Sequence, residues 1–187
     1  TELADGVLSD VSHLILTCNE SGKLFREHAK RGKSKVVLMP ERANDEGFAM
    51  TSSFTSMLLS SLLILGGADD AAVAALSKAA ARALELVQEP ARELAARGFE
   101  RVVYLGSGPL TGLARESALK LLELTAGKVV SYYDSSLGFR HGPKSVLNDS
   151  TLVIVYVSSD PYPRPSALAL LRALPATMPA DNLVVIS

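Results

Sequence analysis

Five short runs of uninterrupted apolar residues, many of them β-branched, constrain the fold of this chain more than any other feature. They lie at 13–17, 35–39, 101–105, 152–157 and 183–186. Strands that are apolar on both sides are covered on both faces, which is typical of a parallel sheet between helices. Segments with helical periodicity separate them, at 23–31, 48–65, 70–88, 110–125 and 166–174. This alternation predicts an α/β fold, with a doubly wound parallel sheet.

The ends of two helices carry their own signals. Asp69 or Asp70 is suited to cap the alanine-rich helix 70–88, and Pro90 is expected to end or kink it. Gly127 suits the carboxyl-terminal stop of helix 110–125.

A weak internal repeat indicates how the chain is organised. HLILTCNESG, a helix and KVVLMPE resemble TLVIVYVSSDPY, a helix and NLVVIS. Only the second copy is preceded by a unit such as 105–144, and only the first is followed by a helix such as 48–65. The simplest interpretation is a slice of a longer two-copy protein, with incomplete copies at 1–67 and 99–187 joined by a helix within 68–98.

Composition excludes several classes of function. The 187 residues are 48% hydrophobic, with a formal net charge of −1, so no basic excess indicates nucleic acid. No apolar run is long enough to cross a bilayer. The single cysteine, Cys18, allows no disulfide within the chain and fits a reducing cytoplasm. The three histidines are scattered, so we expect no metal site.

The segment 105–144 holds most of the residues suited to chemistry, and it begins with a glycine-containing turn. Gly106, Ser107 and Gly108 follow a predicted strand and precede a predicted helix. Glycines let backbone N–H groups approach a ligand, and a helix start favours anions. The turn is therefore either a cradle for a sugar phosphate or a tight connection without a ligand.

The helix after the turn aligns three charged residues. Glu116 and Lys120 are four positions apart, and Lys120 and Glu123 are three apart, so all three share one side. They could include a catalytic base, or they could be a solvated ion-pair stripe. His141 follows in the loop Arg-His-Gly-Pro, where an imidazole can exchange protons near pH 7 or simply bond locally.

Two further loops are candidates for binding. Ser52 and Ser53, with Thr55, begin a helix that they could cap, or they could bind sugar hydroxyls. The loop 158–160 follows a strand end, where ligands bind in open α/β sheets, although it could be an ordinary turn.

The combination of these motifs resembles the sugar isomerase (SIS) domain family. The helix motif E-x-A-L-K-x-x-E is present as ESALKLLE at 116–123, and the H-G-P loop lies at 141–143. The sequence is similar to the isomerase half of glucosamine-6-phosphate synthase. It more closely resembles the tagatose-6-phosphate ketose/aldose isomerases, also described as galactosamine-6-phosphate deaminases, through AMTSSFT, LGFRHGPKS and SDPY.

The resemblance implies tandem SIS domains, each a three-layer αβα sandwich around a parallel sheet. It implies that Glu123 is the proton-shuttling base and His141 the ring-opening group, reached from a neighbouring subunit of a homodimer. Gly106, Ser107, Gly108, Glu116, Lys120, Ser52 and Ser53 would then bind substrate. The family's serine- and threonine-rich phosphate loop should precede Thr1, and Gly138 stands where glucosamine-6-phosphate synthase has Glu.

The activity that follows is a cytoplasmic isomerase or deaminase of hexosamine 6-phosphates, without metal or organic cofactor. Hydrolysis of the rearranged imine would release ammonia, so the enzyme would also be a hydrolase. A sugar-phosphate-sensing SIS module without catalysis is the alternative, although such a module needs neither Glu123 nor His141. Aldose–ketose isomerisation without loss of ammonia also remains open, as does the identity of the sugar.

Overall fold

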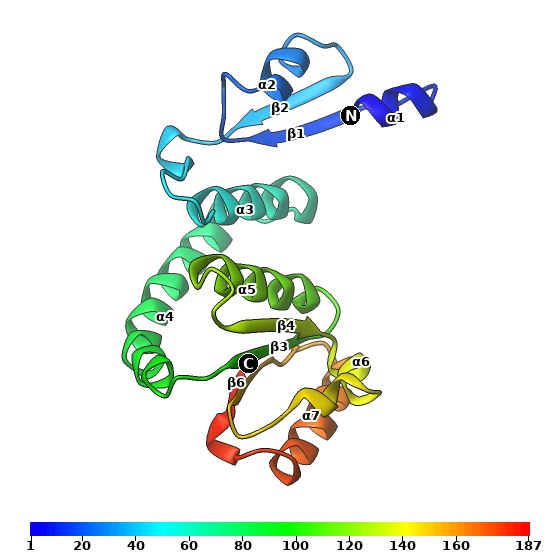
Figure 1. The fold of residues 1–187 in the computed structure, drawn as a ribbon. Helices are drawn as coiled ribbons and strands as arrows, with labels where there is room; N and C mark the ends of the chain where they lie inside the picture. The colour runs from blue at the N-terminus through cyan, green and yellow to red at the C-terminus, as the bar shows by residue number, and fades with distance from the viewer. The chain divides into compact units, whose positions relative to one another are not determined.

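The computed structural model describes residues Thr1–Ser187 and divides them into two compact units, Thr1–Leu84 and Glu85–Ser187 (Figure 1). The division falls within one long helix, α4 (Asp70–Ala96). The two units are called unit 1 and unit 2 below. The family domain boundaries expected from the sequence, at 1–67, 68–98 and 99–187, remain predictions.

Unit 1 is built around a pair of parallel strands. β1 (His13–Thr17) pairs with β2 (Ser34–Leu38) from His13↔Ser34 to Thr17↔Leu38, and α2 (Lys23–His28) lies between them in the chain. Parallel neighbours need such a crossover because a tight turn cannot return the chain to the same edge. The remaining elements are α1 (Glu2–Val7), a 3-10 turn (Glu41–Ala43), α3 (Ser52–Gly66) and the start of α4.

Unit 2 contains a four-stranded parallel sheet in the order β4-β3-β5-β6. The strands are β3 (Arg101–Gly106), β4 (Val130–Asp134), β5 (Thr151–Tyr156) and β6 (Leu183–Ile186). α5 (Leu110–Leu124) covers one face, while α6 (Ser136–Arg140) and α7 (Arg164–Ala173) lie on the other (Figure 1). Three 3-10 turns complete the unit, at Pro143–Val146, Leu174–Ala176 and Ala180–Asn182. The predicted α/β, three-layer arrangement is confirmed.

Strand alternation explains why unit 2 is covered on both faces. Val103, Leu105, Val153 and Val155 are fully buried in a core with Phe139, Leu170, Leu174 and Met178 from the connections and helices. Residues between them on the strands, such as Val102, point to the opposite face. There α5 contributes the buried Ala114 and Ala118, whose small side chains let the helix approach the sheet closely.

Three expectations about element boundaries need correction. The helix α4 does not end at the exposed Pro90 but continues to Ala96, so the flanking turns tolerate the proline. The helix predicted at 48–65 begins only at Ser52, where the carboxylate of Asp45 accepts its first N–H groups. The sequence analysis did not predict α6.

Two capping predictions are confirmed. Asp69 Oδ1 accepts the N–H of Ala72 at 2.9 Å, at the start of α4. Gly127 adopts φ +74° after α5, and its N–H donates to the carbonyl of Leu122 at 3.0 Å. Among the helices, none combines the length and apolar character needed to cross a membrane.

Candidate functional site

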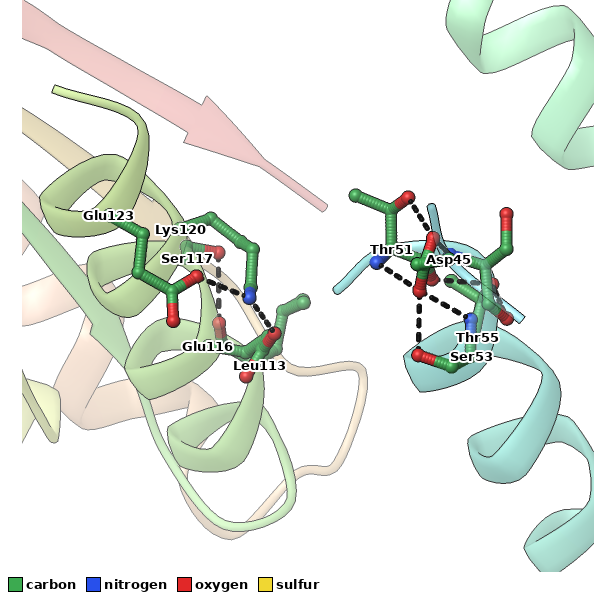
Figure 2. A network of polar contacts seen from close by, with 10 residues as sticks. Asp45, Thr51, Ser53, Thr55, Leu113, Glu116, Ser117, Lys120 and Glu123 are labelled. Carbon is green, nitrogen blue, oxygen red and sulfur yellow. Dashed lines mark hydrogen bonds and ion pairs between the residues drawn. The ribbon is translucent and has the colours of Figure 1, made fainter. Parts of the chain in front are cut away.

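The charged residues predicted on one side of α5 do form a cluster (Figure 2). Lys120 Nζ lies 2.6 Å from Glu123 Oε2 and 3.4 Å from Glu116 Oε1. The three side chains are 20–23% exposed. These are neither fully solvated groups nor buried ones, which separates them from an ordinary surface stripe.

Electrostatics keep the centre of this cluster positively charged. The hydrogen bond to Glu123, with the charge of Glu116 in support, raises the pKa of Lys120 above its ordinary value. Only Oε2 of Glu123 accepts this bond, and Oε1 has no hydrogen-bond partner. Glu123 is therefore a carboxylate that is held at one oxygen and free to accept a proton at the other.

The cluster points away from the sheet that α5 covers. At about 100° per residue, Glu116, Lys120 and Glu123 lie about 140–160° around the helix from the buried Ala118. A substrate at Glu123 therefore meets the outer surface of α5 rather than the interface between this helix and its own sheet. Other parts of the protein must complete the enclosure of such a site.

The turn before α5 has the tight geometry that its glycines suggest. A Cβ at Gly106 would lie 2.2 Å from the carbonyl oxygen of Leu110, and Gly108 adopts φ +61°. The hydroxyl of Thr111 donates to the carbonyl of Gly106 at 2.7 Å. Gly106 is thus required by the close approach of the helix, and Gly108 by its left-handed backbone.

The turn and the charged cluster lie at opposite ends of α5. Between Leu110 and Glu123 the helix rises about 20 Å, at about 1.5 Å per residue. One small sugar phosphate cannot contact both the Gly106–Gly108 turn and Glu123 of the same helix. The structure therefore does not bring together two groups that the sequence analysis assigned to one substrate.

His141 lies at the same edge of the sheet as the glycine turn. Val130 of β4 pairs with Arg101, whereas Asp134 at its other end pairs with Leu105. α6 and His141 follow Asp134, so they lie at the carboxyl ends of the strands, whereas α5 reaches Glu123 near the amino ends. Five residues of strand span about 16 Å. Within one copy of unit 2, His141 and Glu123 are therefore on opposite edges.

The side chain of His141 is available for a ligand or a partner. The imidazole is exposed and makes no hydrogen bond. The backbone N–H of His141 donates to the carbonyl of Gly138 at 3.0 Å, at the end of α6. Local bonding by the imidazole, the alternative left open by the sequence, is not observed.

In unit 1, Ser52 and Ser53 lie beside the carboxylate of Asp45, a residue that the sequence analysis did not indicate. Figure 2 shows Asp45 with Thr51 and Ser53. Asp45 accepts the N–H groups of Thr51, Ser52 and Ser53, each at 2.9 Å. The hydroxyls of Thr51 and Ser53 donate to it as well, at 2.9 and 2.6 Å. These bonds, led by the Ser53 hydroxyl, lower the pKa of Asp45.

The ring around Asp45 distinguishes the two serines. Ser53 is fully buried and its hydroxyl donates to Asp45, so that hydrogen is not free for a sugar. Ser53 is also not the cap, because the carboxylate of Asp45 accepts the helix N–H groups. Ser52 is exposed and its hydroxyl has no partner, so it remains a candidate. The available signal was an acidic residue a few positions before a Ser/Thr-rich helix start.

Comparison with known proteins identifies the class to which this architecture belongs. No family model matches the chain. A Streptomyces coelicolor protein named AgaS is 52% identical over 190 residues, covering all of this chain and 49% of that protein. D-galactosamine-6-phosphate deaminase AgaS of Escherichia coli is 42% identical over 191 residues, again covering all of this chain and 49% of the relative.

A solved structure agrees with these sequence relatives. The crystal structure of tagatose-6-phosphate ketose/aldose isomerase from Escherichia coli superposes with a TM-score of 0.89 at 41% identity, covering 98% of this chain and 51% of that one. This chain belongs to the SIS domain family, and its sequence matches the branch represented by these relatives. The chain spans about half the length of the curated relatives that it matches.

Proposed function

We propose that the protein to which this chain belongs is an isomerase and deaminase of hexosamine 6-phosphates. The observation that carries the proposal is the arrangement of Glu123, held by Lys120 at one carboxylate oxygen and free at the other, on the outer face of α5. The relatives named as galactosamine-6-phosphate deaminase and tagatose-6-phosphate isomerase support the substrate class.

The proposed reaction uses Glu123 twice. Its free carboxylate oxygen removes the proton from C2 of the open-chain sugar, leaving an enolamine, and returns the proton to C1. The product is an imine at C2, which water hydrolyses to the ketone with release of ammonia. Lys120 keeps Glu123 oriented and stabilises negative charge that develops on the substrate oxygen.

Ring opening is assigned to His141 of a second copy of the chain. Within one copy His141 and Glu123 lie at opposite edges of the sheet, whereas a homodimer can bring the exposed imidazole of one copy to the α5 face of the other. The single cysteine, Cys18, is a free thiol, which fits the reducing cytoplasm in which we place the enzyme.

The first test is Glu123→Gln in the complete protein, with ammonia release and ketose formation measured on hexosamine 6-phosphates. Turnover should fall about 100- to 10,000-fold, because the amide keeps the shape of the side chain but accepts no proton. Glu93→Gln on the exposed end of α4 is the matched control and should retain turnover. A Glu123→Gln enzyme with near-normal turnover would remove Glu123 from the mechanism, and ketose without ammonia would leave only isomerisation.

The shared site is tested by mixing two inactive variants, Glu123→Gln and His141→Asn. If subunits exchange randomly, half of the dimers are mixed, and one of their two sites has both groups intact. Activity should recover to about one quarter of the wild-type value. Recovery no greater than the sum of the separate variants, with exchange verified, would show that both groups act within one copy.

A further inference from the structure

A cavity of about 470 Å³ lies at the carboxyl edge of the unit 2 sheet. Its walls come from the loops after β3, β4 and β5, and they include Ser107, Gly108, Ser135, Asp160, Tyr162 and Ser166. From β3 the chain crosses to β4 on one side, and from β5 it crosses to β6 on the other. The cavity therefore sits where the connections diverge, the usual ligand position in open α/β sheets.

The wall nearest α5 offers hydrogen-bond donors that have no acceptor within the protein. The N–H groups of Ser107 and Gly108 have no partner in the protein, and they precede a helix of 15 residues. The Ser107 hydroxyl accepts the N–H of Ser136 at 3.3 Å, which leaves its own hydrogen to donate. Ser166, in the first turn of α7, has a hydroxyl without a partner. Together these groups suit the oxygens of a phosphate.

A second observation concerns a residue next to the cavity wall. The Ser136 hydroxyl is the only buried side-chain polar atom in the chain without a hydrogen-bond partner. Ser136 lies between two residues of the cavity wall, and its N–H donates to Ser107. Ser136 itself does not line the cavity, so its hydroxyl is an unsatisfied group next to the wall and not one that faces a ligand.

The opposite wall suits the sugar rather than the phosphate. One oxygen of the Asp160 carboxylate accepts the N–H of Tyr162 at 2.8 Å, and the other is free to accept sugar hydroxyls. The Tyr162 ring is 92% exposed and can cover the apolar face of a sugar. The cavity wall contains no lysine or arginine, so a phosphate monoester fits better than a polyphosphate.

The cavity lacks the groups needed for the proposed reaction. Within one copy of the chain, neither His141 nor Glu123 lines it, and Glu123 of that copy is at the far end of α5, about 20 Å away. We infer that this cavity is a second ligand site, which binds a phosphorylated sugar without converting it. The inference takes its probe from the proposed substrate class but does not depend on turnover at Glu123.

The test counts binding sites in the complete protein carrying Glu123→Gln, titrated calorimetrically with a hexosamine 6-phosphate. Two sites per chain are expected. Adding Ser166→Glu should weaken one of them at least about tenfold, because the new carboxylate faces the phosphate. Position 166 is in the first turn of α7, where an acidic residue favours the helix, so folding should be preserved.

Two further variants keep the test decisive. Ser159→Glu, in the exposed neighbouring loop outside the cavity wall, is the charge-matched control and should keep both sites. Tyr162→Glu adds the same charge at an exposed position of the wall, so it should weaken the same site even if Ser166→Glu folds poorly.

A single site per chain, or two sites that neither wall variant affects, would overturn the inference. A single site lost in both wall variants would overturn it differently, by making the cavity part of the reaction site. Turnover is measured separately with Glu123 intact, so absence of the second site and absence of the proposed activity are distinguishable.

Discussion

The helices α3 and α5 are both 15 residues long. The turn before α3 contains serine and threonine, and the turn before α5 contains glycine and serine, yet the two turns are used differently. At α3 the chain supplies its own anion, the Asp45 carboxylate, which accepts three N–H groups and two hydroxyls. At α5 no side-chain oxygen occupies the equivalent place, and the preceding N–H groups of Ser107 and Gly108 remain free. The first N–H groups of α3 are bound by a side chain, whereas those of α5 donate to backbone carbonyls of the preceding turn. Only the N–H groups of Ser107 and Gly108, before α5, lack a partner.

The comparison also separates backbone chemistry from side-chain chemistry along α5. Its amino-terminal end offers N–H groups and hydroxyls, which can bind but cannot take a proton from carbon. The cluster of Glu116, Lys120 and Glu123 runs from the middle of the helix to its carboxyl-terminal end, where one oxygen of the Glu123 carboxylate has no hydrogen-bond partner. A single helix therefore presents two kinds of site about 20 Å apart.

After Glu123→Gln, the largest effect is expected in the same charged cluster, from Lys120→Met in the complete protein. Loss of the ammonium releases both carboxylates from their positions, so kcat should fall about 10- to 100-fold while KM changes less than about threefold. Lys120→Arg should recover part of the loss. Parallel changes in kcat and thermal stability, without recovery by arginine, would indicate a structural role alone.

At the amino-terminal end, Gly106→Ala and Gly112→Ala should have opposite effects on stability. A Cβ at Gly106 meets the Leu110 carbonyl at 2.2 Å, so the free energy of unfolding should fall by about 1–3 kcal/mol. Gly112 lies inside α5 with nothing near its Cβ position, so alanine should raise stability by about 0.5–1 kcal/mol. Urea unfolding of both variants measures this, and equal effects would contradict the close approach seen at Gly106.

The smallest effect is expected at α3, from Asp45→Asn. The hydrogen bonds to Asp45 lower its pKa in the folded state, so they stabilise the fold above the ordinary carboxyl value of 3.8 and lose that contribution as the pH falls below it. The variant should therefore unfold at lower urea than the parent at pH 7, and the gap should begin to narrow only below about pH 3.8 and keep narrowing as the pH falls through the lowered pKa of Asp45. Glu46→Gln, an exposed neighbour, is the control, and a gap that does not narrow at all between about pH 5 and pH 2 would exclude the carboxylate charge as the cause.

Much of the fold could be predicted because each strand and helix carries a local pattern. The strand at 13–17 was predicted with its observed bounds, and the other predicted strands lie within one residue of theirs. α6 was missed because five residues are too few to show periodicity. Pro90 was expected to end or kink the helix, and it does not end it, because the flanking turns of a long helix persist across one missing N–H donor.

The candidate site also combines features that the sequence determined with features that only the tertiary structure decided. Sequence spacing alone determined that Glu116, Lys120 and Glu123 share one side of a helix, and that the glycine turn is about 20 Å from Glu123, since both follow from helical geometry. The tertiary structure decided where His141 lies, because the pairing of β4 with β3 places the end of β4 at one edge of the sheet. It also decided that a side chain caps α3, because Asp45 reaches that helix through a loop whose path no periodicity records.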